Sequence, residues 1–569
     1  MKARRHWMVA ILAALPLVAM AQPVDRGAKQ EVVAGAAAQL DGRTVYQLLL
    51  GEIALQRGDG EVAAQAYYEA AKRTRDAGVI GRGMQVAATA RRYDLALEFG
   101  RQWVEMDPDS ATARHALIGV LAALGRAEEM LPHLRLWLAK DEINRPRNIT
   151  HLTRLFSGVA ERDQVLTSLQ SLLEPYGSLA ESHYVLATAA RIAGQRDLAI
   201  KEAREASRLK PDWWQPVMFE AQVLMTDAPL QAVEALTRFI SVNPKNDDAL
   251  AFRGRILAGM KRFPEARRDL DQALSLSPDD PEHLYPYAVV LLQMRDYAAA
   301  APVLRKLSER DQANRAFANF QLALLDEDDG RIEQAMAGYR LLSPGEYYVS
   351  AQARLAQLLA RQGKPDEGRK LLQEVRNTQS RLSDADQTRL TIAEAQILRE
   401  TKQFEAAFDV LATAIKGQPD EPDLLYDQAM IAELLKRNDV VESNLTRLIA
   451  LKPDNAHAYN ALGYSYVDRN IRLQEARELI QKALALAPDD PFILDSMGWV
   501  LFRMGQAEEA LKHLERAFKL RNDPEIAAHM GEVLWSLGRR KQAREVWEAA
   551  RQKHPGNDVL ADVIKKFIP

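Results

Sequence analysis

The sequence contains no cysteine among its 569 residues. This absence excludes disulfide bonds, thiol catalysis, iron–sulfur clusters and zinc sites built from cysteine. Aromatic residues make up only 7% of the chain, and the formal net charge is −3. Beyond the first residues there is no block of Lys or Arg, because basic and acidic residues are interspersed. The composition therefore argues against nucleic acid as the main ligand.

Motifs of familiar catalytic chemistry are also missing. The ten histidines are scattered along the chain, and the sequence has no HExxH, no GxSxG and no phosphate-binding P-loop. The acidic run at residues 326–329 lacks the alternating ligands and the distal Glu of a calcium-binding EF-hand loop. We interpret this run as a solvated turn. We expect a protein that is not an enzyme and that has no metal or cofactor site.

Long hydrophobic runs are absent except at the start of the chain. There, a basic stretch precedes the apolar residues 8–18, and Ala19-Met20-Ala21 supplies the small residues that a signal peptidase reads. We predict that residues 1–21 are a cleaved signal peptide and that the mature protein is periplasmic, with no membrane span. The alternative is an uncleaved anchor, although the run is shorter than the roughly 20 residues that a span requires.

The stretch Ala456–Pro488 carries the most informative pattern in the sequence. It contains two amphipathic segments joined by a polar turn, with apolar residues at helical spacing. Gly463 in the first segment and Ala476 in the second are expected where the two helices cross. A larger side chain at such a crossing typically costs about 1–3 kcal/mol. The order aromatic, Leu-Gly, aromatic, Ala, bulky apolar, Ala and Pro recurs in several other stretches.

This recurring order resembles the tetratricopeptide repeat family, whose period is about 34 residues. The resemblance implies an all-α fold, a right-handed superhelical solenoid of about 15 helix pairs with a C-terminal capping helix. We expect the small residues at the crossings and the prolines that end the pairs to be structural, namely Gly254, Ala266, Pro278, Pro419, Pro453, Gly463, Ala476, Pro488, Gly498, Ala510, Gly531, Ala543 and Pro555.

The regularity of the pattern varies along the chain and predicts a division into parts. After the signal peptide we expect a flexible segment at 22–43, an N-terminal array at 44–342, a joint of degenerate pattern at 343–387, a C-terminal array at 388–555 and a capping helix at 556–569.

Aromatic residues and carboxylates recur on the first helices of the last four pairs. In tetratricopeptide arrays these helices line the concave groove, and the repeat itself does not require aromatic rings at these positions. The resemblance implies a partner-binding surface, because aromatic anchors dominate interface energetics. The alternative is that neighbouring pairs bury the rings against each other. The predicted partner-binding residues are Tyr426, Asn460, Tyr464, Phe492, Asp495, Trp499, Phe502, Glu532 and Trp535.

The stretch Leu48–Ala77 is similar to the start of a proteobacterial family of exported many-repeat tetratricopeptide proteins. Its best-understood members are outer-membrane lipoproteins that bind a carboxyl-terminal processing protease and present substrates such as cell-wall hydrolases to it. The resemblance implies a periplasmic adaptor of this kind. Lipid anchoring is not expected here, because the sequence has no lipobox cysteine. The alternative function is a structural scaffold of an envelope assembly or polysaccharide export machine.

Overall fold

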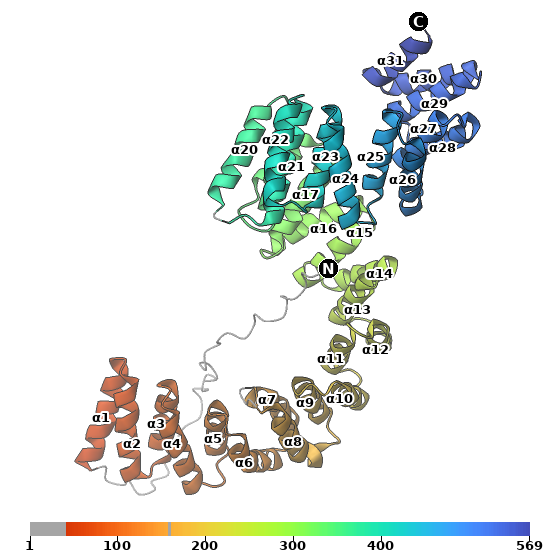
Figure 1. Ribbon diagram of the computed structural model, residues 1–569. Coiled ribbons are helices and arrows are strands. Elements are labelled where there is room, and N and C mark those ends of the chain that lie inside the picture. The colour runs from red at the N-terminus through yellow and green to blue at the C-terminus, as the bar shows by residue number, and fades with distance from the viewer. Residues whose placement is uncertain (1–40, 158–160, 380, 569) are drawn as a thin grey trace. The chain divides into compact units, whose positions relative to one another are not determined.

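The computed structural model describes residues 41–157, 161–379 and 381–568 (Figure 1). Over these residues it contains thirty-one α-helices, one short 3-10 helix and no strand. The predicted signal peptide, residues 1–21, and nearly all of the predicted flexible segment 22–43 lie outside the described residues. None of the described helices is long and apolar enough to cross a membrane.

The chain divides by its internal contacts into two compact units, Met1–Gln231 and Ala232–Pro569. The described helices before this boundary are α1 (Gly42–Gln56), α2 (Gly60–Thr74), α3 (Ala77–Thr89), α4 (Tyr93–Met106), α5 (Ala111–Ala123), α6 (Ala127–Lys140), α7 (Arg145–Leu155), α8 (Arg162–Leu173), the 3-10 helix η1 (Glu174–Tyr176), α9 (Ala180–Ile192), α10 (Arg196–Leu209) and α11 (Trp214–Leu224). The boundary itself falls inside α12 (Pro229–Val242).

The second unit continues with helices of similar length. They are α13 (Asp247–Gly259), α14 (Phe263–Leu276), α15 (Pro281–Gln293), α16 (Tyr297–Arg310), α17 (Arg315–Asp328), α18 (Ile332–Arg340), α19 (Tyr348–Arg361), α20 (Pro365–Thr378), α21 (Asp384–Glu400), α22 (Phe404–Gly417), α23 (Pro422–Leu434), α24 (Asn438–Leu451), α25 (Ala456–Asp468), α26 (Leu473–Leu486), α27 (Pro491–Arg503), α28 (Ala507–Leu520), α29 (Pro524–Ser536), α30 (Arg540–Lys553) and α31 (Asp558–Phe567).

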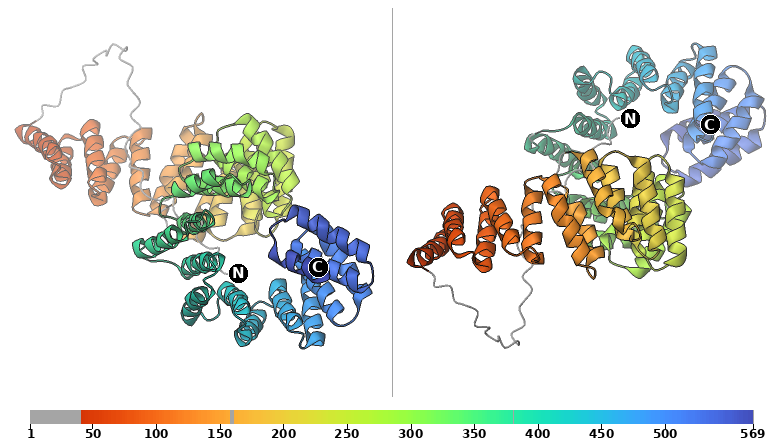
Figure 2. Two further views of the ribbon diagram at one scale, coloured as in Figure 1. Left: turned by 90° about the horizontal axis from the view of Figure 1, so that it is seen from above. Right: turned by 90° about the horizontal axis from the view of Figure 1, so that it is seen from below.

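Successive helices form pairs that stack on one another within each unit. In the second unit α13 packs on α14, α25 on α26 and α27 on α28, and α26 packs on α27 of the next pair. The regular pairing is interrupted at α7, which packs mainly on α9, and α31 follows the last pair and packs on α29 and α30. The succession of paired helices within each unit can be followed in Figures 1 and 2. The predicted all-α repeat fold is confirmed over the described residues.

Polar side chains cap the start of several helices, and residues in the left-handed backbone conformation turn the chain between the two helices of a pair. Asn455 caps α25, because its side-chain oxygen accepts from the backbone N–H of Ala458 at 3.1 Å. In most pairs the turn between the two helices places one residue at positive φ. This residue is Gly505 between α27 and α28 and Lys261 between α13 and α14. Glycine adopts this conformation without the penalty that a Cβ brings.

Small residues lie where the helices of a pair cross. A Cβ added to Gly463 would lie 2.7 Å from Cγ1 of Ile480 and 2.9 Å from the carbonyl oxygen of Ala476. Gly254, Gly498 and Gly531 similarly face the second helix of their pairs. The partner alanines Ala266, Ala476, Ala510 and Ala543 are fully buried.

The five prolines predicted to be structural lie just beyond the ends of second helices. Each follows the last helical residue by two positions, in keeping with the tendency of proline to follow a helix that it cannot continue. They are Pro278 after α14, Pro419 after α22, Pro453 after α24, Pro488 after α26 and Pro555 after α30.

The crossing at Gly463 gives a direct test of this packing. We expect Gly463→Ala to lower the free energy of unfolding by about 1–2 kcal/mol, because the overpacking of roughly 1–3 kcal/mol exceeds the helix propensity that alanine gains. Gly119 in α5 is the matched control, because a Cβ there meets nothing within 4 Å. Gly119→Ala should raise stability by about 0.5–1 kcal/mol. Denaturant unfolding of both variants measures the difference, and equal effects would contradict the packing argument.

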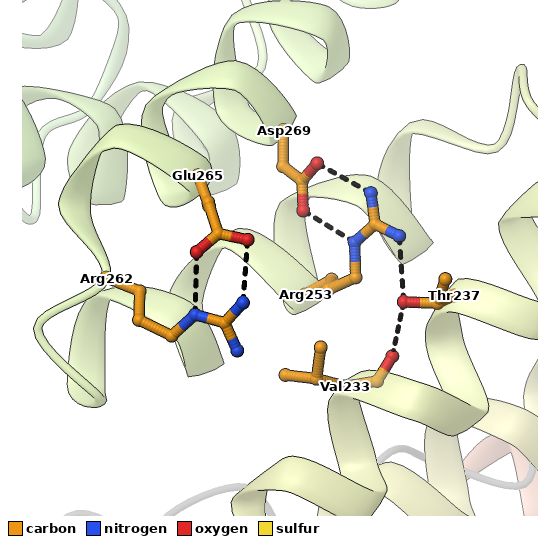
Figure 3. Close-up of polar contacts among 6 residues, drawn as sticks. All are labelled: Val233, Thr237, Arg253, Arg262, Glu265 and Asp269. Carbon is orange, nitrogen blue, oxygen red and sulfur yellow. Dashed lines mark hydrogen bonds and ion pairs between the residues drawn. The ribbon is translucent and has the colours of Figure 1, made fainter.

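A buried ion pair ties the first pair of the second unit together (Figure 3). Nε and Nη2 of Arg253 on α13 donate to the two carboxylate oxygens of Asp269 on α14 at 2.6 and 2.7 Å. Nη1 donates to the hydroxyl of Thr237 on α12 at 3.0 Å, and that hydroxyl donates to the Val233 carbonyl at 2.7 Å. The Arg253 and Asp269 side chains are only 17% and 10% exposed. One guanidinium therefore links three helices.

Candidate functional site

The candidate site lies on the first helices of the last pairs, α25, α27 and α29. Trp499 on α27 stacks on His529 of α29, with ring centroids 4.1 Å apart and an interplanar angle of 17°. Nδ1 of His529 donates to the Asp495 carboxylate at 2.9 Å. The Trp499 side chain is 8% exposed, and Asp495 is buried. These three side chains therefore join α27 to α29 through internal contacts.

Tyr464 extends this arrangement to α25. Its hydroxyl donates to Oε1 of Glu525 on α29 at 3.2 Å, and its ring lies 6.5 Å from that of His529. The contact spans two repeats, so α25 and α29 approach each other across α27. We name Tyr464, Asp495, Trp499, Glu525 and His529 the aromatic–acid cluster.

The charges of the cluster favour a protonated His529. Burial alone would lower the pKa of His529, but the charge and hydrogen bond of Asp495, with Glu525 and Glu532 nearby, outweigh it, so the pKa is raised. Burial also raises the pKa of Tyr464, and the surrounding carboxylates of Glu525 and Asp495 add to this shift. The phenol therefore remains a hydrogen-bond donor. The cluster offers carboxylate oxygens as hydrogen-bond acceptors and aromatic rings as apolar surface. We find no nucleophile–base pair in it.

The other predicted partner-binding residues lie outside the cluster. Phe502 packs beside Trp499 with ring centroids 5.3 Å apart. Phe492 is 42% exposed, and the Arg521 guanidinium lies 5.1 Å from its ring centroid. Tyr426 on α23 and Asn460 on α25 are half-buried, and the amide oxygen of Asn460 is buried without a hydrogen-bond partner.

Trp535 and Glu532 face the helices that follow α29 instead. Trp535 stacks on Trp547 of α30 at 5.9 Å and lies 5.8 Å from Phe567 of α31. The Glu532 carboxylate accepts from Nζ of Lys566 on α31 at 3.2 Å. The structure thus brings Tyr464, Asp495 and Trp499 together and places Trp535 in a separate aromatic group.

Sequence reasoning missed His529, the residue that joins the cluster. It lies 34 positions after Asp495, close to one repeat period, so the two residues lie one position out of register on neighbouring first helices, on which Gly498 and Gly531 are equivalent. That spacing was a usable signal, because one period separates side chains that lie side by side in a stacked array.

Asp427 on α23, outside the aromatic–acid cluster, gives the stability of the protein a pH dependence. Burial raises the pKa of its carboxyl to about 6, against the opposing charge of Arg399 and with support from Asp423. A folded pKa above the unfolded value of about 3.9 means that stability is lost as pH rises from about 4 to about 6. We expect Asp427→Asn to raise the free energy of unfolding at pH 7.5 by about 1–2 kcal/mol and to lose this advantage towards pH 4.

Denaturant unfolding of Asp427→Asn and wild type across this pH range measures the effect. Asp439→Asn is the control, because Asp439 is an exposed carboxylate on the next helix, α24, and does not contribute to the shift of Asp427. An equal advantage for Asp427→Asn at every pH would contradict the assignment of the raised pKa.

One group of possible metal ligands occurs among the described residues. Asp247, Asp248 and His283 bring ligand atoms within 4.8 Å of one another. Nε2 of His283 already lies 3.4 Å from the Asp247 carboxylate, and Asp247 also accepts from the hydroxyl of Ser277. Internal hydrogen bonds account for this grouping, and we do not assign it as a metal site.

Comparison with known proteins gives consistent results along the chain. Family models described as tetratricopeptide repeat match residues 257–324, 229–281, 442–491 and 496–558. The TPR repeat-containing protein PA4667 of Pseudomonas aeruginosa is 33% identical over 529 residues, which cover 86% of this chain and 82% of that protein. Tetratricopeptide repeat protein 21B of Xenopus laevis is 23% identical over 62% of this chain and 26% of its own length.

Two solved structures align with the chain at lower identity. The crystal structure of the APC/C hetero-tetramer Cut9-Hcn1 aligns with 93% of this chain and 97% of its own, at 15% identity and a TM-score of 0.37. A tetratricopeptide repeat protein from Parabacteroides merdae aligns with 44% of this chain and 97% of its own, at 14% identity and a TM-score of 0.36.

Proposed function

Because the chain belongs to the tetratricopeptide repeat family, whose members bind protein partners, we propose that it is a non-catalytic scaffold that binds proteins through its C-terminal first helices. The observation that carries this proposal is the aromatic–acid cluster, which spans three consecutive first helices. Its members on α25, α27 and α29 come from different repeats, so together they offer one extended surface.

The exposed parts of this surface define what it can bind. Tyr464 of the cluster is half-buried, Glu525 offers an exposed carboxylate, and Phe492 at the start of α27, outside the cluster, adds an exposed apolar ring. The buried side chains of Trp499 and Asp495 join α27 to α29 through their contacts with His529. A partner segment with an apolar anchor flanked by Lys or Arg complements this combination, because aromatic anchors supply binding energy and opposite charges supply specificity.

We further propose that the scaffold works in the periplasm as an adaptor that presents substrates, such as cell-wall hydrolases, to a carboxyl-terminal processing protease. The support is the leader-like start of the sequence and the resemblance of Leu48–Ala77 to exported adaptors of this kind. The partners under this proposal are the protease and its substrates.

Affinity capture tests the proposal. The purified mature chain is immobilised and exposed to periplasmic extract, and the retained proteins are identified by mass spectrometry. The proposal predicts a processing protease together with hydrolases. Export-channel subunits in their place would support the scaffold of an export machine and overturn the adaptor role.

A matched pair of variants tests whether partner capture depends on this surface. Phe492→Ala should reduce retention of the partners by about tenfold or more, as expected for loss of an aromatic anchor. Tyr297 on α16 is the control, because its side chain is 43% exposed and does not belong to α25, α27 or α29. Tyr297→Ala should retain the partners at the wild-type level. Equal retention by both variants would exclude Phe492 from the binding surface.

A further inference from the structure

A groove on the first helices α17, α19, α21 and α23 lies in the second unit, apart from the aromatic–acid cluster. It has a volume of about 640 Å³, and its lining includes the apolar side chains of Leu324, Ala353 and Ile392. Figure 1 shows α17, α21 and α23 within the same part of the second unit. None of the predicted partner-binding residues lines this groove.

Three arginines line the groove, Arg354 and Arg361 on α19 and Arg389 on α21. Each is about half exposed and makes one ion pair within the chain, with Glu327 at 3.1 Å, Glu400 at 3.4 Å and Asp386 at 2.8 Å. A guanidinium carries five N–H donors in a planar fork, so a single carboxylate partner leaves donors available to a ligand. The groove therefore combines apolar side chains with three guanidinium groups that keep free donors.

Polar side chains complete the groove. Gln357 on α19 donates to the side-chain amide oxygen of Gln396 on α21, which sets a pair of amides across the groove. Side-chain amides of this kind pair with the N–H and C=O groups of an extended backbone. At the α23 end the lining is acidic, because it contains Glu421 and Asp423.

We propose that this groove binds an extended peptide segment that carries both acidic and aliphatic side chains. The arginines take the carboxylates, because guanidinium and carboxylate groups pair in a bidentate geometry that Lys does not match. The apolar side chains of the lining contact the aliphatic side chains that lie between the carboxylates of the segment. A nucleic acid fits less well, because Glu421 and Asp423 repel a continuous phosphate backbone.

The proposed segment has the opposite charge to the partner of the aromatic–acid cluster. The two surfaces are separate, and this inference does not rest on the proposed adaptor function. A chain with both surfaces can hold an acidic and a basic segment at the same time, on α17–α23 and on α25–α29.

Random peptide display tests the proposal. Phage-displayed random dodecapeptides are selected on the immobilised full chain at low salt, and an enriched peptide is then labelled with fluorescein and titrated by anisotropy. We expect enrichment in Asp and Glu at two or more positions. The affinity should fall by about tenfold or more in the triple variant R354Q/R361Q/R389Q. It should also fall as ionic strength rises, since the lining arginines are exposed to solvent.

The triple variant R437Q/R447Q/R516Q is the matched control. Its arginines are also about half exposed and each forms one ion pair, but none of them lines the groove. We expect its affinity to stay within about twofold of wild type and both triple variants to keep their far-UV circular dichroism. Phe492→Ala should leave this binding unchanged, which separates it from the proposed function.

Three results would overturn the proposal. They are the absence of acidic enrichment, an equal loss of affinity in the two triple variants, and stronger competition by a twelve-residue oligothymidylate than by the unlabelled peptide. The last result would assign the groove to a nucleic acid instead.

Discussion

Trp499→Ala is expected to lower the free energy of unfolding of the C-terminal array by about 3–5 kcal/mol, the usual cost of truncating a packed Trp. The ring is 8% exposed and stacks on His529, so its removal leaves a cavity and deprives the imidazole of its packing partner. Chemical denaturation followed by circular dichroism measures the shift. The sequence suggested this ring as a binding anchor, and its burial gives it a structural role as well.

Phe492→Ala is the control for this result, because Phe492 lies on the same helix but is largely exposed. We expect it to change stability by no more than about 0.5 kcal/mol, as for most surface substitutions. Full stability of Trp499→Ala would show that the ring is not packed as the structure places it. A large loss in Phe492→Ala would show that the surface of α27 is covered in the free protein.

Asp269→Ala is expected to lower the free energy of unfolding by about 3–5 kcal/mol, because it leaves the Arg253 guanidinium charged and poorly solvated. The pair is bidentate and mostly buried between α13 and α14, with Thr237 as a third partner (Figure 3). Denaturant unfolding measures the loss. The double variant Arg253→Met/Asp269→Leu should recover most of it, because an apolar pair of similar volume removes the buried charge.

The neighbouring pair Arg262–Glu265 provides the control in the same view (Figure 3). It has the same bidentate geometry, with both bonds at 2.7 Å, but both side chains are half-exposed. Glu265→Ala should cost no more than about 1 kcal/mol, because exposed ion pairs contribute little. A loss as large as that of Asp269→Ala would show that geometry, and not burial, decides the cost.

The fold could be predicted from the sequence because each pair is defined by local features. Gly463, Ala476 and Pro488 mark a crossing and a helix end within one period, and each acts through neighbours close in the chain. The segments that form α5 to α8 lack this small-residue signature and are helical nonetheless, because their apolar residues keep the helical period.

The candidate site was less accessible to sequence reasoning, because its contacts depend on how successive pairs are placed. The Tyr464–Glu525 hydrogen bond joins helices two repeats apart, and Trp535 turns towards Trp547 and Phe567 of later helices. Periodicity identifies which helix face these residues occupy but not which neighbours they meet. The nine predicted partner-binding residues remain predictions, and the arginine-lined groove had no sequence motif to indicate it.

Hydroxyl-radical footprinting of the full chain, alone and with a captured partner, tests most directly whether the C-terminal first helices bind proteins. The method reports the solvent exposure of individual side chains, and Phe492 and Tyr297 start from nearly equal exposure. We predict that the partner slows oxidation of Phe492 and Tyr464 at least about fivefold, because rings at the core of an interface are desolvated, and leaves Tyr297 unchanged. Unaltered oxidation of Phe492 and Tyr464 in a saturated complex would contradict the account.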